Sequence, residues 1–141
     1  AYPRGSRAMI AVLDVSAAVE ILLQKEKSRK FQTQCQQAAW VIAPDLFVSE
    51  IANVFWRYHR AGVLDREMCL QLADDGLDLI DDFVEAQDLW KEALAEGIKN
   101  ERAVYDMFYL VLARRNDAML ITNDSSLASL CRKLKIAVVD K

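Results

Sequence analysis

The sequence has few of the residues that build disulfide scaffolds or zinc centres. Its 141 residues include three cysteines, Cys35, Cys69 and Cys131, and a single histidine, His59. No two cysteines form a CxxC pair, and one histidine does not complete a zinc site of the usual Cys and His type. We therefore expect reduced, unpaired thiols and no zinc centre.

Long hydrophobic runs are also absent. No stretch of about 18 uncharged apolar residues is present to span a bilayer. The N-terminus has no basic segment leading into an apolar signal core, so we expect an intracellular, cytoplasmic protein with no membrane partner. Residues 1–8 contain Pro3-Arg4-Gly5-Ser6, resemble a protease-site tag and are set aside. Residues 9–141 then have the usual size of one domain, about 100–200 residues.

Basic residues are in the minority, with 18 Lys and Arg against 21 Asp and Glu and a net charge of −3. This balance argues against binding nucleic acid through a broad basic surface. The acidity is local, however, because the stretch from Asp74 to Asp88 contains many acids and no Lys or Arg. A polyanionic substrate therefore remains compatible with the sequence if a few placed cations or bound metal ions contact it.

Apolar residues make up 53% of the chain and fall into short segments. Continuous apolar runs are typical of strands buried in a parallel sheet, and they occur at residues 9–13, 40–43, 118–122 and 136–139, with a briefer candidate at 83–84. Spacings of three and four residues predict helices at residues 16–38, 47–58, 64–80, 87–95, 104–115 and 125–133. Ser16 and Asp45 are expected to cap helices, and Gly62 and Gly97 to end them. This alternation predicts a three-layer α/β/α domain with a mainly parallel central sheet flanked by helices.

Two aspartates directly follow predicted strands. Asp14 comes after residues 9–13, and Asp124 comes shortly after residues 118–122. Ligand sites of open α/β sheets lie outside the carboxyl ends of the strands, so the two carboxylates are expected to face one another if their strands are neighbours. Either residue alone also fits a simple helix cap.

Two further acids lie in apolar stretches of predicted helices, Glu50 within residues 47–58 and Asp106 within residues 104–115. Glu50 also fits an exposed helix face, and Asp106 a first-turn acid that complements the helix dipole. If all four acids converge, burial and mutual repulsion disfavour their charged forms unless cations compensate. Hard divalent ions such as Mg²⁺ or Mn²⁺ are the natural counter-ions of an oxygen-only site.

Four sequence blocks give the chain a resemblance to the PIN domain family, and within it to the VapC-type toxin ribonucleases. The blocks are LDVS at 13–16, SEIANVFWR at 49–57, YDMFYLVLA at 105–113 and LITNDSSL at 120–127. They follow the order of the family across residues 9–140. The resemblance implies one PIN-like nuclease domain and places the four acids of the family at Asp14, Glu50, Asp106 and Asp124.

The resemblance also implies supporting roles for two hydroxyl residues, Ser16 and Thr122. Asn53 is a further supporting candidate. Arg57 lies two helical turns after Glu50 on roughly the same face, where it could contact a phosphate or pair with a carboxylate. The chain departs from many relatives after its last acid, where Ser125 and Ser126 stand in place of a basic residue.

The activity that the resemblance implies is metal-assisted hydrolysis of RNA phosphodiester bonds with one or two Mg²⁺ or Mn²⁺ ions. The implied role is the toxin of a type II toxin-antitoxin pair, with an antitoxin protein as partner and a homodimer as assembly. The alternatives are a catalytically silent PIN fold that binds RNA or protein, and a phosphatase or receiver domain. The phosphatase usually has a second acid at the position of Ser16, and the receiver a late lysine, and neither pattern is complete here.

Overall fold

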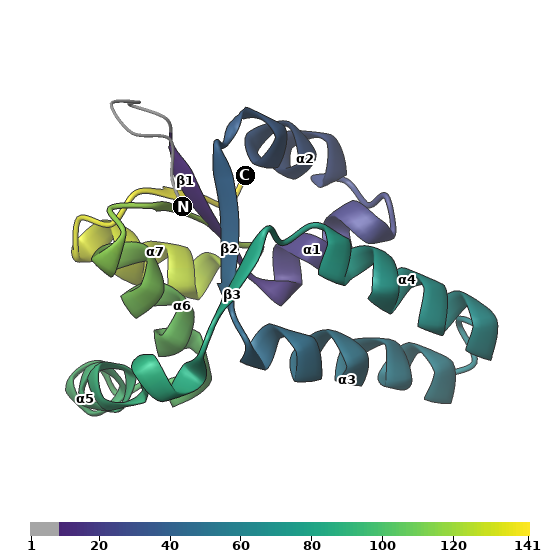
Figure 1. The fold of residues 1–141 in the computed structure, drawn as a ribbon. Helices are drawn as coiled ribbons and strands as arrows, with labels where there is room; N and C mark the ends of the chain where they lie inside the picture. The colour runs from purple at the N-terminus through teal and green to yellow at the C-terminus, as the bar shows by residue number, and fades with distance from the viewer. Residues whose placement is uncertain (1–8) are drawn as a thin grey trace.

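Five short parallel strands form one sheet at the centre of the molecule (Figure 1). The structure is a computed structural model that describes residues 9–141. The tag expected at residues 1–8 lies outside the described residues. The strand order is β3-β2-β1-β4-β5, and every neighbouring pair is parallel. The strands are β1 (Ile10–Leu13), β2 (Trp40–Pro44), β3 (Asp82–Val84), β4 (Met119–Ile121) and β5 (Val138–Val139). The predicted strand at 9–13 is thus the central one.

Helices cover both faces of this sheet, which confirms the three-layer α/β/α prediction. One face carries the helices that connect β1, β2 and β3, and the other carries those that lead back to β4 and β5 (Figure 1). The first group is α1 (Val15–Leu22), α2 (Ser28–Gln37), α3 (Leu46–Arg60) and α4 (Arg66–Asp78). The second group is the 3₁₀ turn Ala86–Asp88, α5 (Trp90–Asn100), α6 (Val104–Arg115) and α7 (Ser125–Lys133).

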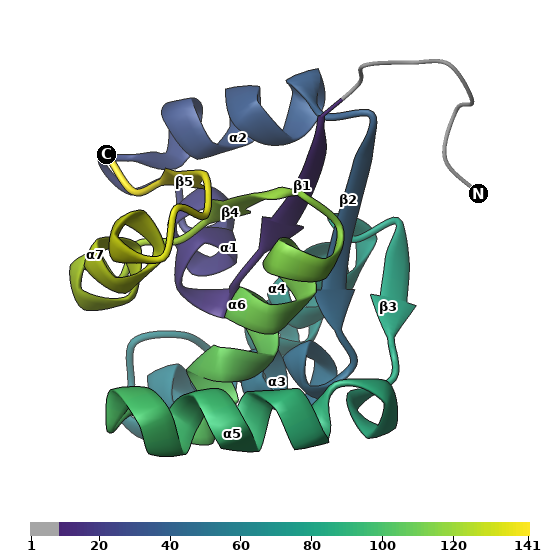
Figure 2. The same ribbon diagram turned by 90° about the vertical axis from the view of Figure 1, so that its left-hand side faces the viewer.

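Helix α6 is buried over most of its length. Its residues from Met107 to Ala113 are all buried, although the spacing predicted a single apolar face. The helix lies between the sheet and α5, so it is covered on more than one side (Figure 2). A helix that is apolar nearly all round is stable only in such a place. The acid near its N-terminus, Asp106, is therefore held on a rigid element.

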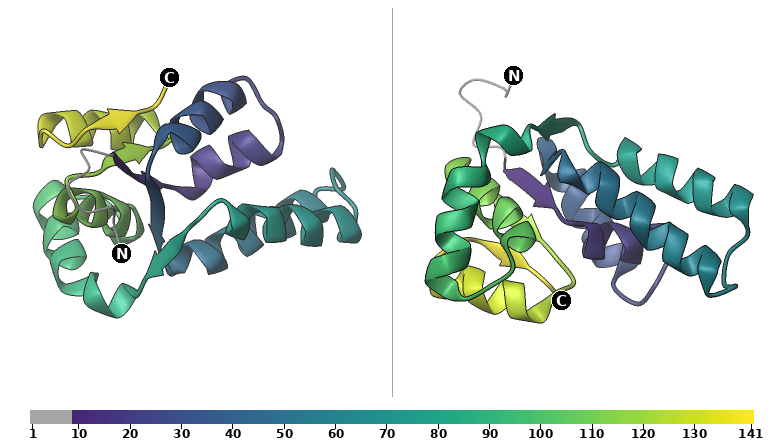
Figure 3. Two further views of the ribbon diagram at one scale, coloured as in Figure 1. Left: turned by 45° about the horizontal axis from the view of Figure 1, so that its top comes forward. Right: turned by 90° about the horizontal axis from the view of Figure 1, so that it is seen from below.

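The strands all point their carboxyl ends the same way, as the arrowheads of β1 to β3 show in Figure 2. Helices α3 and α4 pack side by side and project from the sheet on that side (Figure 3). Gly76 allows α4 to approach closely, since a Cβ there would lie 3.2–3.3 Å from Leu22 and Ile51 side chains. The carboxyl edge of the sheet is thus framed by α1, α3 and α6.

Several predicted boundaries were wrong because turns interrupt the helical spacing. The helix predicted over 16–38 is two helices, since Gln24 adopts a left-handed conformation with φ 52° after α1. Gly97 does not end α5, which runs to Asn100 and closes at Glu101 with φ 54°. Gly62 does terminate α3, with φ 75°. The last strand is also shorter than predicted.

None of the helices within residues 9–141 is both long and apolar enough to cross a bilayer. The three cysteines are unpaired, as predicted, with Cys69 and Cys131 buried and Cys35 partly so. Burial raises the thiol pKa of both Cys35 and Cys131 to about 11, which keeps these groups protonated and unreactive near neutral pH.

Candidate active site

Asp14 follows β1 directly and caps α1. Its Oδ1 accepts a hydrogen bond from the Ala17 backbone N–H at 3.0 Å and from the Ser16 hydroxyl at 2.7 Å. Its Oδ2 accepts from the Thr122 hydroxyl. The expectation that Ser16 caps this helix was wrong, because Asp14 takes the N-cap position and Ser16 lies in the first turn. The carboxylate is therefore both a cap and a fixed group at the carboxyl edge of the sheet.

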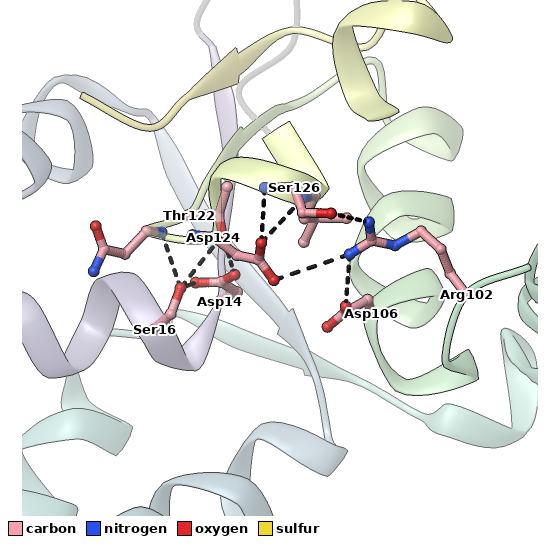
Figure 4. Close-up of polar contacts among 9 residues, drawn as sticks. Asp14, Ser16, Arg102, Asp106, Thr122, Asp124 and Ser126 are labelled. Carbon is pink, nitrogen blue, oxygen red and sulfur yellow. Dashed lines mark hydrogen bonds and ion pairs between the residues drawn. The ribbon is translucent and has the colours of Figure 1, made fainter. Parts of the chain in front are cut away.

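Two hydroxyls tie β1 to the end of β4 beneath this carboxylate (Figure 4). The Thr122 hydroxyl accepts from the Asp124 backbone N–H at 3.0 Å, and the Ser16 hydroxyl accepts from the Asn123 backbone N–H at 2.9 Å. The two hydroxyl oxygens are 3.3 Å apart. The backbone around the last acid is thus positioned by the same side chains that orient the first.

Burial raises the pKa of Asp14 to about 6, against the opposing hydrogen bonds from Thr122 and Ser16. The residue is only 7% exposed. Burial also raises the pKa of Glu50, although the Tyr109 hydroxyl donates to Glu50 Oε1 at 2.6 Å and lowers it. The nearby Asp106 charge raises both values further. Acids that are costly to ionise and share one region are a frequent property of functional sites.

Asp124 caps α7 through Oδ1, which accepts from the backbone N–H groups of Ser126 and Leu127 at 2.9 and 3.1 Å. Its Oδ2 points the other way, toward Arg102 Nη2 at 3.9 Å. The same nitrogen donates to Asp106 Oδ2 at 3.1 Å. One guanidinium therefore stands between the third and fourth acids (Figure 4).

The four acids line one pocket of about 690 Å³. Of the other site residues predicted from sequence, Ser16, Asn53 and Arg57 line it as well, whereas Thr122 is fully buried behind Asp14. Asp45, expected only to cap α3, makes no capping bond there and instead accepts from the Ala86 backbone N–H. The pocket therefore brings together seven of the eight predicted positions.

Sequence reasoning missed several groups of this pocket. Tyr109 lines the pocket and donates to Glu50, and Arg102 contacts Asp106 from outside the lining. Lys25, Tyr58, Glu20 and Asn123 also line the pocket. Only Arg102 left a local signal, its spacing of four residues before Asp106. The others come from elements that only the fold brings together.

The end of the pocket formed by α3 carries positive charge. Lys25 Nζ donates to the Tyr58 hydroxyl at 3.0 Å and lies 5.6 Å from the centre of the Tyr58 ring. Arg57 is exposed in the same wall and forms no ion pair with any residue between 9 and 141. The pocket thus has an acidic end at the sheet and a basic, aromatic wall formed by α3 and by Lys25 in the turn between α1 and α2.

The donor chemistry of the acidic end suits a hard divalent ion. Its groups are carboxylate, hydroxyl and amide oxygens, and no histidine or cysteine lines the described pocket. In the described part of the chain, no three acidic, histidine or cysteine side chains lie close enough together to hold a metal ion as they stand. Mg²⁺ often keeps several water ligands and uses only one or two carboxylates, so the arrangement fits such an ion with water completing its shell.

Several known proteins are similar to this chain in sequence or in fold. Ribonuclease VapC3 from Pyrobaculum aerophilum is 29% identical over 126 residues, which cover 85% of this chain and 93% of that protein. The crystal structure of PAE2754 from Pyrobaculum aerophilum superposes with a TM-score of 0.73 at 20% identity, covering 97% of this chain and 88% of that one. VapBC2 from Rickettsia felis, bound to a DNA fragment from its promoter, gives a TM-score of 0.65 at 12% identity over 93% and 98%.

The family itself is settled by the sequence. The sequence profile of the PIN domain matches residues 11–133, from the central strand to the end of α7. This span includes all four acids and both hydroxyls beneath them. The chain therefore belongs to the PIN domain family, as its four sequence blocks predicted.

Proposed function

We propose that the protein is a divalent-metal-dependent endoribonuclease, the toxin of a type II toxin-antitoxin pair, with cytoplasmic RNA as its substrate. The observation that carries the proposal is that four carboxylates, from the ends of β1 and β4 and from α3 and α6, line one pocket. The similarity to a protein named a VapC ribonuclease supports the same reading.

Asp14, Glu50, Asp106 and Asp124 would hold one or two Mg²⁺ or Mn²⁺ ions. A divalent ion supplies charge neutralisation at the phosphate and lowers the pKa of water that attacks it. The protein supplies orientation. Asp14 is held by two hydroxyls and a backbone N–H, and Glu50 is held by Tyr109, so these two carboxylates have fixed orientations before a cation arrives.

The opposite wall would hold the RNA strand. Arg57 and Lys25 provide cations for phosphates, and the Tyr58 ring provides a surface on which a base can stack. Asn53, beside Arg57 on α3, adds an amide that can hydrogen-bond to the sugar or base. Binding by a few placed cations is consistent with the net charge of −3.

We extend the proposal to the partners, an antitoxin and a second copy of the chain. Helix α5 exposes Trp90, Leu94 and Ile98 at four-residue steps, with Ile98 72% exposed. Such a stripe is typical of an interface. If it joins two copies, the double variant Leu94→Glu, Ile98→Glu gives a monomer in light scattering where the unaltered protein gives a dimer. A monomer for both proteins would contradict the homodimer.

The decisive experiment measures cleavage of a fluorescent RNA by purified protein. We expect cleavage with Mg²⁺ or Mn²⁺, none with EDTA, and a loss of at least 100-fold in Asp14→Asn and Asp106→Asn, since each removes a charged oxygen from the site. Asp74→Asn, the same exchange at an exposed position of α4, is the matched control and keeps full activity. Activity that survives EDTA or both site variants would contradict the proposal, and no activity with folded protein would favour a silent binding module.

A further inference from the structure

Arg102 is a cation beside two of the acids that line the pocket, Asp106 and Asp124. It lies in the turn between α5 and α6, and its backbone is fixed by a hydrogen bond from its N–H to the Gly97 carbonyl at 3.1 Å. A Cβ on Gly97 would lie 3.0 Å from the Arg102 carbonyl oxygen, a contact that would push this carbonyl away, so the close approach favours glycine. The Arg102 side chain thus extends toward Asp106 and Asp124 from a fixed backbone position.

The guanidinium makes three contacts at the site, of unequal quality. Nη1 donates to the Ser126 hydroxyl at 2.6 Å, and Nη2 donates to Asp106 Oδ2 at 3.1 Å. Nη2 is 3.9 Å from Asp124 Oδ2, too long for a hydrogen bond. Nε is buried without a hydrogen-bond partner in the described structure. Neither Asp106 nor Asp124 accepts two parallel hydrogen bonds from the guanidinium, although this is the geometry that suits a guanidinium best.

This position gives Arg102 two opposing effects. Its charge stabilises Asp106 and Asp124 beside one another, and its Nη2 lies 3.1 and 3.9 Å from their Oδ2 atoms, where it would compete with a divalent ion for these oxygens. A fixed positive charge there lowers the affinity of the carboxylates for a second cation. An RNA phosphate, in contrast, is a better partner for the guanidinium than the present contacts, because it accepts two parallel N–H bonds.

We propose that Arg102 is an internal counter-ion that is exchanged for substrate. In the free protein it pairs with Asp106 and faces Asp124, and when RNA binds it turns to a phosphate and leaves the two carboxylates to the divalent ion. Arg102 thereby couples RNA binding to metal binding. The inference rests on the proposed nuclease function, but it concerns binding and is tested without cleavage.

The test measures two affinities separately for the whole chain. Mn²⁺ affinity is measured by calorimetry without RNA, and RNA affinity by fluorescence anisotropy with a short single-stranded RNA in EDTA. For Arg102→Met we expect Mn²⁺ to bind about 10-fold more tightly, the effect of removing one interaction of a charged group. RNA should bind about 10-fold more weakly, with a salt dependence reduced by about one phosphate contact.

The opposite directions of these two changes separate the proposed role from a structural one. A merely structural residue would weaken both affinities together or change neither. Arg102→Lys keeps the positive charge but lacks the planar pair of N–H donors of the guanidinium. Mn²⁺ affinity should therefore return toward that of the unaltered protein, while RNA affinity recovers only in part. The matched control is Arg66→Met, which removes an arginine that is 74% exposed and paired with Glu67 away from the acids; both affinities should stay unchanged.

Each remaining outcome is decisive. If the unaltered protein binds Mn²⁺ and Arg102→Met binds it with the same or a lower affinity, the role of Arg102 is overturned and the nuclease proposal stays intact. Failure of the unaltered protein to bind Mn²⁺ overturns both. If circular dichroism shows that Arg102→Met does not fold, the shorter neutral variant Arg102→Gln is judged by the same two affinities.

Discussion

The Asp14 carboxylate should cost the metal-free protein stability at neutral pH, so Asp14→Asn should be more stable than the unaltered chain. Burial raises the pKa of Asp14 from 3.8 to about 6. An acid whose pKa is higher in the folded than in the unfolded state is harder to ionise when folded. Its contribution to stability is full below pH 3.8 and is lost as the pH rises through about 6.

The size of the effect follows from that shift. A difference of about two pKa units corresponds to roughly 3 kcal/mol between the two protonation states. The amide of the Asp14→Asn variant cannot reproduce every hydrogen bond of the carboxylate. Its NH₂ group must face the Thr122 hydroxyl, which donates a hydrogen bond to Asp14 in the unaltered protein. That hydroxyl can accept instead and turn its hydrogen toward Ser16, 3.3 Å away, at a cost of about 1 kcal/mol. The net gain for Asp14→Asn is about 1–2 kcal/mol at pH 8, given these magnitudes.

The assay is urea unfolding in EDTA at intervals from pH 4 to pH 8. The free energy of unfolding of Asp14→Asn minus that of the unaltered protein should rise across this range and level off above about pH 7. Asp140→Asn is the matched control with the opposite sign, because the Arg132 guanidinium lowers the pKa of Asp140. It should destabilise the protein above pH 4. A difference for Asp14→Asn that is negative at pH 8, or that does not change with pH, would refute the reasoning.

Three further variants test other parts of the site. Tyr109→Phe removes a hydrogen bond that lowers the pKa of Glu50, so the acidic limb of the cleavage profile should move to higher pH; an unshifted profile would contradict this role. Thr122→Val should reduce the free energy of unfolding by about 1–3 kcal/mol by leaving buried groups unpaired, while Thr122→Ser stays near the unaltered value in the same urea assay. Gly97→Ala should cost about 1–3 kcal/mol by overpacking and displace the turn that carries Arg102, which thermal unfolding and Mn²⁺ titration would detect.

The fold class could be predicted because its signals are local. The apolar run before Asp14 is typical of a strand inside a parallel sheet, and the spacing in residues 104–115 is typical of a helix with a buried face. Errors occurred where a single turn overrides a continuing pattern. Gln24 interrupts the helix predicted over 16–38. Helix α5 continues past Gly97, where the missing side chain allows close contact with the Arg102 backbone.

The acids of the pocket were recognisable from the sequence, but their environment was not. The four carboxylates stand in family blocks and at strand ends, positions that short stretches of sequence define. What surrounds them comes from distant parts of the chain. The Tyr109 hydroxyl reaches Glu50 across 59 residues, and the Thr122 hydroxyl reaches Asp14 across 108 residues.

The sequence by itself thus determined the alternation of strands and helices, the family and the positions of the acids, because each depends on neighbouring residues and on backbone geometry. Only the tertiary structure decided how strongly Asp14 is buried and where the Arg102 guanidinium lies. Both depend on packing between elements that are far apart in the chain, and burial and charge at a site are properties of that packing.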